Sequence, residues 1–426
     1  MKVVHITTFY HSGAGIAAYR IHEALLQQNV DSTFLSLDLL KSDGTVSALQ
    51  FKKSRVSLLK KLFYKCISVA ENRLSLALSK RTYYERRLRK VLPDLKCERT
   101  SLPFSKCNIL EHPAVRTADI IHLHWVSGFL NYPSFFKNNT KPVVWTFHDM
   151  NPFQGIFHYK TDELRNYNVA GKLDEKIREI KTTLIKSRNF SLSIVSPSRW
   201  LLDAALNSPG YKEVPAICIR NPLNTFKFYP DESLSLRQNL SIPADNTIFL
   251  FVAEVVESHR KGFALLIEAL QELGDSSITL LAIGTILNLE AHGLHIINIG
   301  RITDNDLLRQ YYSMADAFVI PSLEDNLPNV MLESMACGTP VLSFDIGGMS
   351  EIIVDYVNGL KAKEVSGSSL KDLLNEFILN KEKFNSVAIR SFALQSFSEE
   401  VIGKEYSKNY LQTLNAISRR QLQQII

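Results

Sequence analysis

The stretch that decides the fold is "DAFVIPSLEDNLPNVMLESMACGTPVLSFDIGGMSEII", residues 316–353. An apolar run ends near Pro321, a polar loop follows, and a helix begins at Pro328 and ends at Gly338 before the next apolar run. This order of strand, helix and strand predicts one repeating unit of an α/β fold.

The same unit presents two carboxylates, Asp325 in the loop and Glu333 within the helix. Sugar and ribose hydroxyls donate hydrogen bonds, for which paired carboxylates are suitable acceptors. The helix N-terminus beside Asn326 and Leu327 offers backbone N–H groups to an anion or a hydroxyl. Glu324 gives a second possible register, which we rank below that of Asp325. The stretch therefore predicts a site for a hydroxyl-rich ligand.

Strands and helices alternate twice along the 426 residues. Apolar runs rich in β-branched residues include "KVVHITTF", "DIIHLHW" and "PVVWTFH" in the first half, and "TIFLFVA", "ITLLAIG" and "DAFVIPS" in the second. Residues 216–230, "AICIRNPLNTFKFYP", contain turn-forming Asn and Pro and indicate a linker. We predict an α/β fold of two doubly wound, Rossmann-like domains, residues 1–220 and 221–400, which face each other across a cleft.

Composition favours a protein of the cytoplasm. The five cysteines are scattered without a C-x-x-C pair, which argues against a zinc site or a disulfide framework. The N-terminus lacks the apolar core of a cleavable signal, and no uncharged apolar stretch approaches the roughly 20 residues of a membrane span.

Positive charge is concentrated in residues 52–90, within a basic helical region at 52–97. The 52–90 segment holds 13 Lys or Arg against Glu71 and Glu85. Its apolar residues recur at helical spacing, which suits an anionic membrane surface on the inner face of the cytoplasmic membrane. An ordinary domain helix with solvated lysines explains the pattern equally well. Without a recognisable nucleic-acid-binding module, we expect no nucleic-acid partner.

Residues 316–353 resemble the donor-binding segment of the retaining family 4 glycosyltransferases, which have the two-domain GT-B fold. The motif is Glu, seven residues, Glu, then a small residue and A-x-G-x-P-V; it is matched by Glu333, Ala336, Gly338, Pro340 and Val341. Asp325 stands at the first Glu position. The resemblance is greatest to the subgroup that builds colanic acid, exopolysaccharides and capsules. It implies that Glu333 binds the nucleotide ribose, that Asp325, Asn326 and Leu327 hold the donor sugar, and that residues 401–426 form a helix crossing back to the first domain.

A second matching segment is "FLFVAEVVESHRKGFALLIEAL", residues 249–270. It is similar to the part of the family in which basic side chains grip the donor diphosphate. Lys261 matches the family's lysine. The usual arginine after the strand is replaced by Ala253 and Glu254, and Arg260 is the candidate to supply the missing charge.

Two histidines are expected at strand ends, His124 after "DIIHL" and His148 after "PVVWTF". The resemblance implies one histidine close to the transferred sugar. We assign this catalytic role to His124, and an acceptor-side or supporting role to His148 and Asp149. The alternative gives the catalytic place to His148. His122, inside its strand, is expected to be structural.

The N-terminal loop "HSGAGIAA" also fits the G-x-G-x-x-A spacing of a dinucleotide-binding turn through Gly13, Gly15 and Ala18. In NAD domains the first glycine follows the strand almost at once, whereas "TTFYHS" intervenes here. Asp38 lies where a ribose-binding acid belongs, so an oxidoreductase remains the weakest alternative. We expect Gly13 and Gly15 to face the donor phosphates.

Taken with the resemblance, these residues predict a retaining, metal-independent glycosyltransferase without a cofactor. Its partners would be a nucleotide diphosphate-sugar and a glycan acceptor, most simply lipid-linked. A nucleotide-sugar epimerase of the same fold and a non-catalytic partner subunit are the alternatives. Asp304 and Asp306 form a D-x-D pattern typical of metal-dependent transferases, but they open a helix and are expected to cap it.

Overall fold

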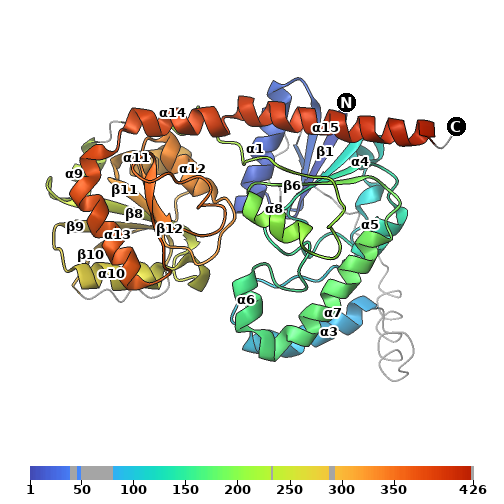
Figure 1. Ribbon diagram of the computed structural model, residues 1–426, viewed down its shortest axis with the longest axis horizontal. Helices are drawn as coiled ribbons and strands as arrows, with labels where there is room; N and C mark the ends of the chain where they lie inside the picture. The colour runs from blue at the N-terminus through green and yellow to red at the C-terminus, as the bar shows by residue number, and fades with distance from the viewer. Residues whose placement is uncertain (39–45, 49–79, 232–233, 287–292, 424–426) are drawn as a thin grey trace, which may run out of the picture.

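The computed structural model describes residues 1–38, 46–48, 80–231, 234–286 and 293–423. Within these residues the chain forms two domains, each built on one sheet of parallel strands with helices on both faces (Figure 1). The N-terminal sheet has the order β3 (Val46–Ala48), β2 (Asp31–Ser36), β1 (Lys2–Thr7), β4 (Ile120–Leu123), β5 (Val143–Thr146), β6 (Leu192–Ser196) and β7 (Ala216–Cys218).

Alternation along the central strands forms two cores in the N-terminal domain. Val3 faces a cluster under α1 and α15, whereas Val4 faces a larger cluster under the helices of the opposite layer. Each fully buried aliphatic side chain contributes roughly 1.5–3 kcal/mol. The helices of this domain are α1 (Gly13–Gln27), α3 (Lys80–Val91), α4 (Pro113–Thr117), α5 (Tyr132–Asn138), α6 (Lys160–Arg165), α7 (Tyr167–Lys186) and α8 (Arg199–Leu206), with short 3-10 turns η1 (Leu92–Asp94) and η2 (Ile109–Glu111).

The C-terminal sheet has the order β10 (His295–Gly300), β9 (Ile278–Thr285), β8 (Thr247–Val255), β11 (Ala317–Ile320), β12 (Val341–Phe344) and β13 (Gly359–Ala362). Phe249 and Leu250, neighbours on β8, face two different apolar clusters on opposite sides of the sheet. The helices are α9 (Leu234–Asn239), η3 (His259–Lys261), α10 (Phe263–Leu273), α11 (Asn305–Met314), α12 (Asn329–Ala336), α13 (Gly367–Asn380), η4 (Lys381–Lys383) and α14 (Ser386–Phe397).

The last helix, α15 (Glu399–Gln423), follows α14 and lies along the N-terminal domain (Figure 1). It packs on α1, and Tyr406 and Tyr410 are fully buried against the N-terminal sheet. The hydroxyl of Tyr410 lies 2.6 Å from His122 Nδ1, and that of Tyr406 lies 3.1 Å from Thr146 Oγ1. The C-terminal helix is therefore part of the N-terminal core.

Two sequence predictions differ from the structure. The interpretation of residues 216–230 as linker was wrong at its start, because Ala216–Cys218 forms the edge strand β7 against β6. These three residues are only partly buried, so they lack the continuous apolar run of a central strand. Residues 52–79 of the basic segment lie outside the described residues. The described remainder includes α3, whose Tyr84 stacks on Phe104 in a small apolar cluster.

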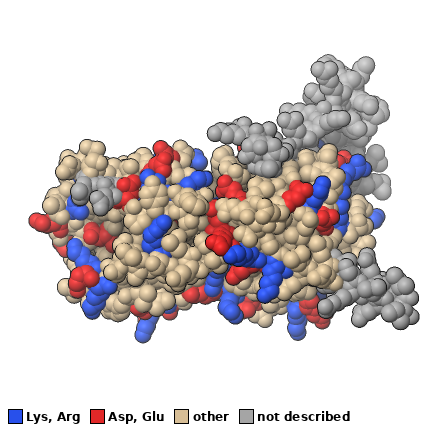
Figure 2. Space-filling model, turned by 90° about the horizontal axis from the view of Figure 1, so that it is seen from above, with Lys and Arg blue, Asp and Glu red and all other residues tan. Residues whose placement is uncertain are grey.

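None of the described helices is both long enough and apolar enough to cross a membrane. On the face that carries α15, acidic and basic side chains are interspersed over both domains (Figure 2). The described part of this face therefore carries no broad patch of a single sign.

Candidate active site between the domains

A cavity of about 1450 Å³ lies between the two domains and is lined by both. Its N-terminal wall comes from loops that follow β1, β4 and β5, and its C-terminal wall from loops that follow β8 and β11. All of these loops leave the carboxyl ends of parallel strands, where ligands of doubly wound sheets bind. The volume exceeds that of typical single-ligand pockets and suits two substrates side by side.

The glycine turn begins α1 at the cavity. Ser12 caps the helix by accepting a hydrogen bond from the Gly15 N–H at 3.1 Å. Gly13 lines the cavity, and a Cβ added there would meet nothing within 4 Å. A Cβ at Gly15 would lie 1.9 Å from the Phe9 carbonyl oxygen, so this glycine permits the tight turn. Of the two predicted glycines, only Gly13 is on the wall.

The predicted basic pair meets Asp325 directly. Lys261 Nζ lies 2.6 Å from Asp325 Oδ2, and Arg260 Nη1 lies 3.2 Å from the same oxygen. Burial alone would raise the pKa of Asp325, but the two cations, Lys261 foremost, hold it at about 2. Asp325 is therefore ionised at neutral pH, and its negative charge holds the two cations in place in the loop that follows β8.

Arg260 is held more tightly than Lys261. Its guanidinium lies 4.1 Å from the centre of the Tyr159 ring and donates to Glu98 Oε2 at 3.0 Å. Gly262, with φ +70°, follows directly, and a Cβ there would lie 1.7 Å from the Pro321 carbonyl oxygen. The close approach of two strand-end loops thus requires glycine and fixes where the basic pair sits.

Glu333 is 5% exposed and borders the cavity from α12. Arg20 of α1 donates to its Oε1 at 2.6 Å, and the Tyr312 hydroxyl donates to Oε2 at 3.2 Å. The ion pair joins the two domains, because Arg20 lies on α1 of the N-terminal domain and Glu333 on α12 of the C-terminal domain. Glu333, the residue predicted to bind the nucleotide ribose, thus borders the cavity, and one of its carboxylate oxygens is paired with Arg20.

The loop before α12 makes further contacts between the domains. Asn326 Oδ1 accepts from the Ser198 hydroxyl at 2.5 Å, and its Nδ2 donates to the carbonyl of His148 at 3.3 Å. Both Asn326 and Leu327 line the cavity. Glu324, the residue of the second register, accepts hydrogen bonds from the N–H groups of residues 160 and 161 at the start of α6. Its carboxylate caps a helix of the other domain, so Asp325 is the loop carboxylate beside the basic pair.

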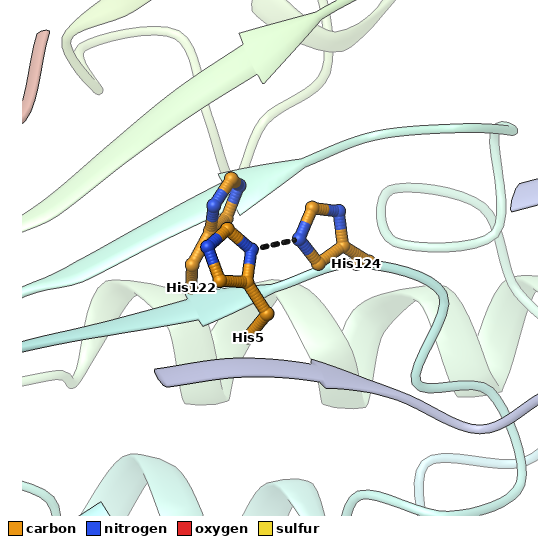
Figure 3. A group of neighbouring side chains, drawn as sticks. All are labelled: His5, His122 and His124. Carbon is orange, nitrogen blue, oxygen red and sulfur yellow. Dashed lines mark hydrogen bonds between the residues drawn. The ribbon is translucent and has the colours of Figure 1, made fainter. Parts of the chain in front are cut away.

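Histidines from adjacent strands form a buried network (Figure 3). His5 of β1 is the direct register partner of His122 on β4, and His124 lies two residues beyond. His5 Nδ1 and His124 Nε2 are 2.9 Å apart, and His124 Nδ1 lies 3.3 Å from His148 Nε2. Burial lowers the pKa of His5, His122 and His124 well below 6.5, and that of His148 to about 4. The network is therefore neutral at physiological pH.

The direction of the hydrogen bonds in this histidine network follows from one nitrogen that the described residues leave without a hydrogen-bond partner. His5 Nε2 is buried without a partner among the described residues. Because a buried N–H without a partner is rarer than an unused lone pair, His5 Nε2 carries no proton. His5 then donates to His124, His124 donates to His148, and the proton of neutral His148 sits on Nδ1. His148 lines the cavity, whereas His124 is 2% exposed and lies behind it. The assignment of the sugar-facing place to His124 stays a prediction, and it is His148, the alternative, that the structure places on the cavity wall.

Three histidine nitrogens of this cluster lie within 4.8 Å of one another, the spacing of a possible metal site. Their donor atoms are largely committed elsewhere: both ring nitrogens of His122 contact hydroxyls, of Tyr410 at 2.6 Å and Thr146 at 2.8 Å. The arrangement fits a hydrogen-bonded network better than a metal centre. In the D-x-D pattern, Asp304 accepts from the Asp306 N–H at 2.8 Å and caps α11, as expected.

Comparison with known proteins finds a family match within the C-terminal domain. Residues 233–391 match the family model described as "Glycosyl transferases group 1". The chain is 25% identical over 279 residues to the D-inositol 3-phosphate glycosyltransferase of Streptosporangium roseum, an alignment that covers 61% of each chain. This part of the chain is therefore similar to the group 1 glycosyltransferases.

Solved structures show that the chain has the GT-B fold. Sucrose-phosphate synthase from Thermosynechococcus elongatus superposes with a TM-score of 0.69 at 18% identity, covering 98% of this chain and 100% of that one. The Anabaena protein HepE, in complex with UDP-glucose, gives a TM-score of 0.63 at 16% identity, with 97% and 100% covered. The chain thus spans the whole fold of these structures. In sequence, it aligns with 61% of the length of the Streptosporangium roseum relative.

Several cavity residues were not predicted from the sequence. Arg20 gave no signal within α1, since an arginine on a helix is ordinarily solvated. Glu98 and Tyr159, which hold Arg260, stand in segments without a motif. Asp149 was predicted, and the structure places it on the wall, where it accepts from Trp125 Nε1 at 2.6 Å. These residues contact side chains from distant parts of the chain, so no local sequence pattern marks them.

Proposed function

We propose that the protein is a retaining glycosyltransferase that moves a sugar from a nucleotide diphosphate-sugar to a glycan. One observation carries the proposal: Lys261 with Arg260, Glu333 and the Gly13 turn converge on a single cavity between two parallel-sheet domains. Cations suit a diphosphate, and a carboxylate suits ribose hydroxyls. The UDP-glucose complex of HepE, which has the same fold, supports a donor of this class.

In the proposed reaction the bond between the sugar C1 and the diphosphate oxygen breaks, and a bond from C1 to the acceptor oxygen forms on the same face. The acceptor proton passes to an oxygen of the departing diphosphate, so no protein base is required. Negative charge grows on that diphosphate, and Lys261, whose side chain is 23% exposed, is the cation best placed to follow it. With Arg260 beside it, the protein would need no metal ion.

His148 is the histidine that we propose beside the transferred sugar, because it reaches the cavity wall while His124 does not. Its Nδ1–H would donate to a sugar hydroxyl, with His124 fixing the tautomer from behind. Asp325 would order the basic pair and, with Asn326, border the donor sugar.

The acceptor that we propose is a growing, lipid-linked glycan of an exopolysaccharide or capsule. Support comes from the resemblance of residues 316–353 to that subgroup. The cavity has room for it, since its N-terminal wall is lined by residues that the donor site does not use. Attachment to a membrane through residues 52–90 would bring the enzyme to such an acceptor.

The test begins with calorimetric binding of UDP, GDP, ADP and NAD to the purified protein. We expect one nucleoside diphosphate to bind, and Lys261→Ala and Glu333→Gln to weaken it tenfold or more. The matched control is Lys404→Ala, which removes an exposed lysine on α15 outside the cavity. Binding of NAD alone, indifferent to Glu333, would overturn the proposal in favour of an oxidoreductase.

Turnover separates the remaining alternatives. With the matching nucleotide-sugar and an acceptor mixture, we expect transfer with retained anomeric configuration, unchanged by EDTA. Conversion of the donor to an epimer without acceptor would indicate an epimerase instead. Donor binding without any turnover by the wild type would indicate a non-catalytic subunit.

A further inference from the structure

A cation and two aromatic rings form a second feature of the cavity, which we name the Arg99 platform: Phe9, Arg99 and Trp125. Phe9 follows β1 and Trp125 follows β4, which are neighbours in the sheet, and their ring centres are 5.6 Å apart. The Arg99 guanidinium carbon lies 5.3 Å from the Phe9 ring centre and 5.1 Å from that of Trp125. All three residues line the cavity.

The platform is held rigidly from beneath by buried polar groups. Asp149 Oδ2 accepts from Trp125 Nε1 and from His158 Nδ1, both at 2.6 Å. The His158 ring stacks on Trp125 with 5.4 Å between centres, and its Nε2 lies 2.8 Å from the Ser101 hydroxyl. Burial would raise the pKa of Asp149, but the His158 contact and these hydrogen bonds lower it. An ionised carboxylate therefore fixes the indole, so its position is set before any ligand arrives.

The charge of Arg99 is not neutralised within the described part of the chain. Its side chain is exposed, and its contacts there are the two aromatic faces. The adjacent carboxylate, Glu98, is used by Arg260 at 3.0 Å and by the Ser258 hydroxyl. By contrast, Arg20 and Arg260 both face carboxylates across the cleft. Arg99 is thus a guanidinium on the cavity wall that has no counter-ion among the described residues.

This combination defines the ligand chemistry. A guanidinium forks onto the two oxygens of a phosphate or a carboxylate, and aromatic rings present a flat, electron-rich face to the C–H side of a sugar ring. The platform belongs to the N-terminal wall, whereas Lys261 and Glu333 belong to the C-terminal wall. We propose that the Arg99 platform binds the glycan acceptor through an anionic group on the accepting sugar, either a phosphate or a carboxylate. The inference rests on the proposed function and specifies its acceptor class.

The experiment uses three probes on the purified full chain: glucose 1-phosphate, glucuronate and glucose, titrated by calorimetry at low ionic strength. We expect an anionic probe to bind at least tenfold more tightly than glucose. Arg99→Gln should remove that preference, and Arg99→Lys, which keeps the charge but not the fork, should retain part of it. Arg116→Gln, which removes an exposed arginine on α4 outside the cavity, is the matched control and should change nothing.

Preference for glucose 1-phosphate would identify a phosphate-bearing acceptor, and preference for glucuronate an acidic sugar. Equal binding of the three probes would overturn the proposal. So would anionic binding that survives Arg99→Gln and disappears in Lys261→Ala, since the probes would then occupy the donor site. Nucleoside diphosphate binding is measured on the same variants and should be unchanged by Arg99→Gln. Its absence in the wild type, with Arg99-dependent probe binding intact, would refute the proposed function and leave the anion site standing.

Discussion

Lowering the pH from 7.5 to 5.5 should destabilise the N-terminal domain through its buried histidines. His5, His122 and His124 are 0%, 0% and 2% exposed, and burial foremost holds the pKa of each well below 6.5. In the unfolded chain each takes up a proton near its ordinary pKa of about 6.5. Below that pH the unfolded state binds more protons than the native state, so the free energy of unfolding falls with pH.

The size of the loss follows from these three groups and from His148, whose pKa burial lowers to about 4. At pH 5.5 a histidine that stays neutral in the native state costs RT ln 11, about 1.4 kcal/mol, and four cost about 5–6 kcal/mol. Two other groups of this domain titrate nearby: burial lowers the pKa of Lys181 to about 7 and raises that of Asp162 to about 6. Their effects over this interval have opposite signs and are each under about 1 kcal/mol. The loss of about 5–6 kcal/mol is a large part of the roughly 5–15 kcal/mol that stabilises a typical domain.

Tryptophan fluorescence measures this domain alone, because Trp125, Trp145 and Trp200 all lie within it. Urea titrations at pH 7.5, 6.5 and 5.5 should show the midpoint falling by about 3 M in total for a slope of about 2 kcal/mol/M. His124→Gln removes one of the four titrating groups and should leave about three quarters of the pH dependence. The exposed His11, changed to Gln, is the control and should leave all of it.

A wild-type loss below about 1 kcal/mol would refute this reasoning, as would a His124→Gln variant with the full pH dependence. A fall in stability on addition of EDTA would also refute it, since a bound cation would then hold the nitrogens that we assign to hydrogen bonds. Any of these three results would show that the cluster is not a neutral network.

Three further predictions concern contacts within and between the domains. Arg20→Ala leaves the buried Glu333 carboxylate without its cation and should cost about 3 kcal/mol, partly restored in the double variant with Glu333→Gln, as measured by calorimetric unfolding. Tyr410→Phe removes the hydroxyl beside His122 Nδ1 and should cost about 1–2 kcal/mol in fluorescence-detected urea unfolding, whereas an unchanged midpoint would show that the contact contributes little. Gly262→Ala places a Cβ 1.7 Å from a backbone oxygen and should weaken nucleoside diphosphate binding at least tenfold in calorimetry, because the adjacent basic residues must move.

The strands that the sequence predicted best are those at the centre of each sheet. Runs such as residues 192–196 and 317–320 are buried on both faces and therefore continuously apolar. The short edge strand Ala216–Cys218 was interpreted as linker, and Gly359–Ala362 was not predicted at all. Ala216–Cys218 is partly exposed, and Gly359–Ala362, although mostly buried, is only four residues long and contains Gly359 and Lys361, so neither has the continuous apolar run of a central strand.

The same distinction separates the predicted and the missed residues of the site. Lys261 and Asp325 belong to segments whose spacing within a few residues carries the signal. Arg20 meets Glu333 only because α1 of one domain faces α12 of the other. Both predicted histidines follow their strands, since β4 ends at Leu123 and β5 at Thr146. His124 comes one residue after its strand and is buried behind the cavity, whereas His148 comes two residues after its strand and lines the cavity. The sequence pattern does not show such a difference of one residue.

The ion pair between Arg20 and Glu333 also bears on how a donor would bind. A carboxylate buried this deeply needs a cation to stay ionised, and Arg20 supplies it through Oε1 at 2.6 Å. The second oxygen, Oε2, accepts one hydroxyl, from Tyr312 at 3.2 Å, and retains a further lone pair. A ribose hydroxyl can therefore donate to Glu333 without displacing Arg20, and the arginine supports the site rather than competing for it. On this reasoning Arg20→Ala should weaken nucleoside diphosphate binding instead of strengthening it, and tighter binding would show that the arginine blocks the ribose position.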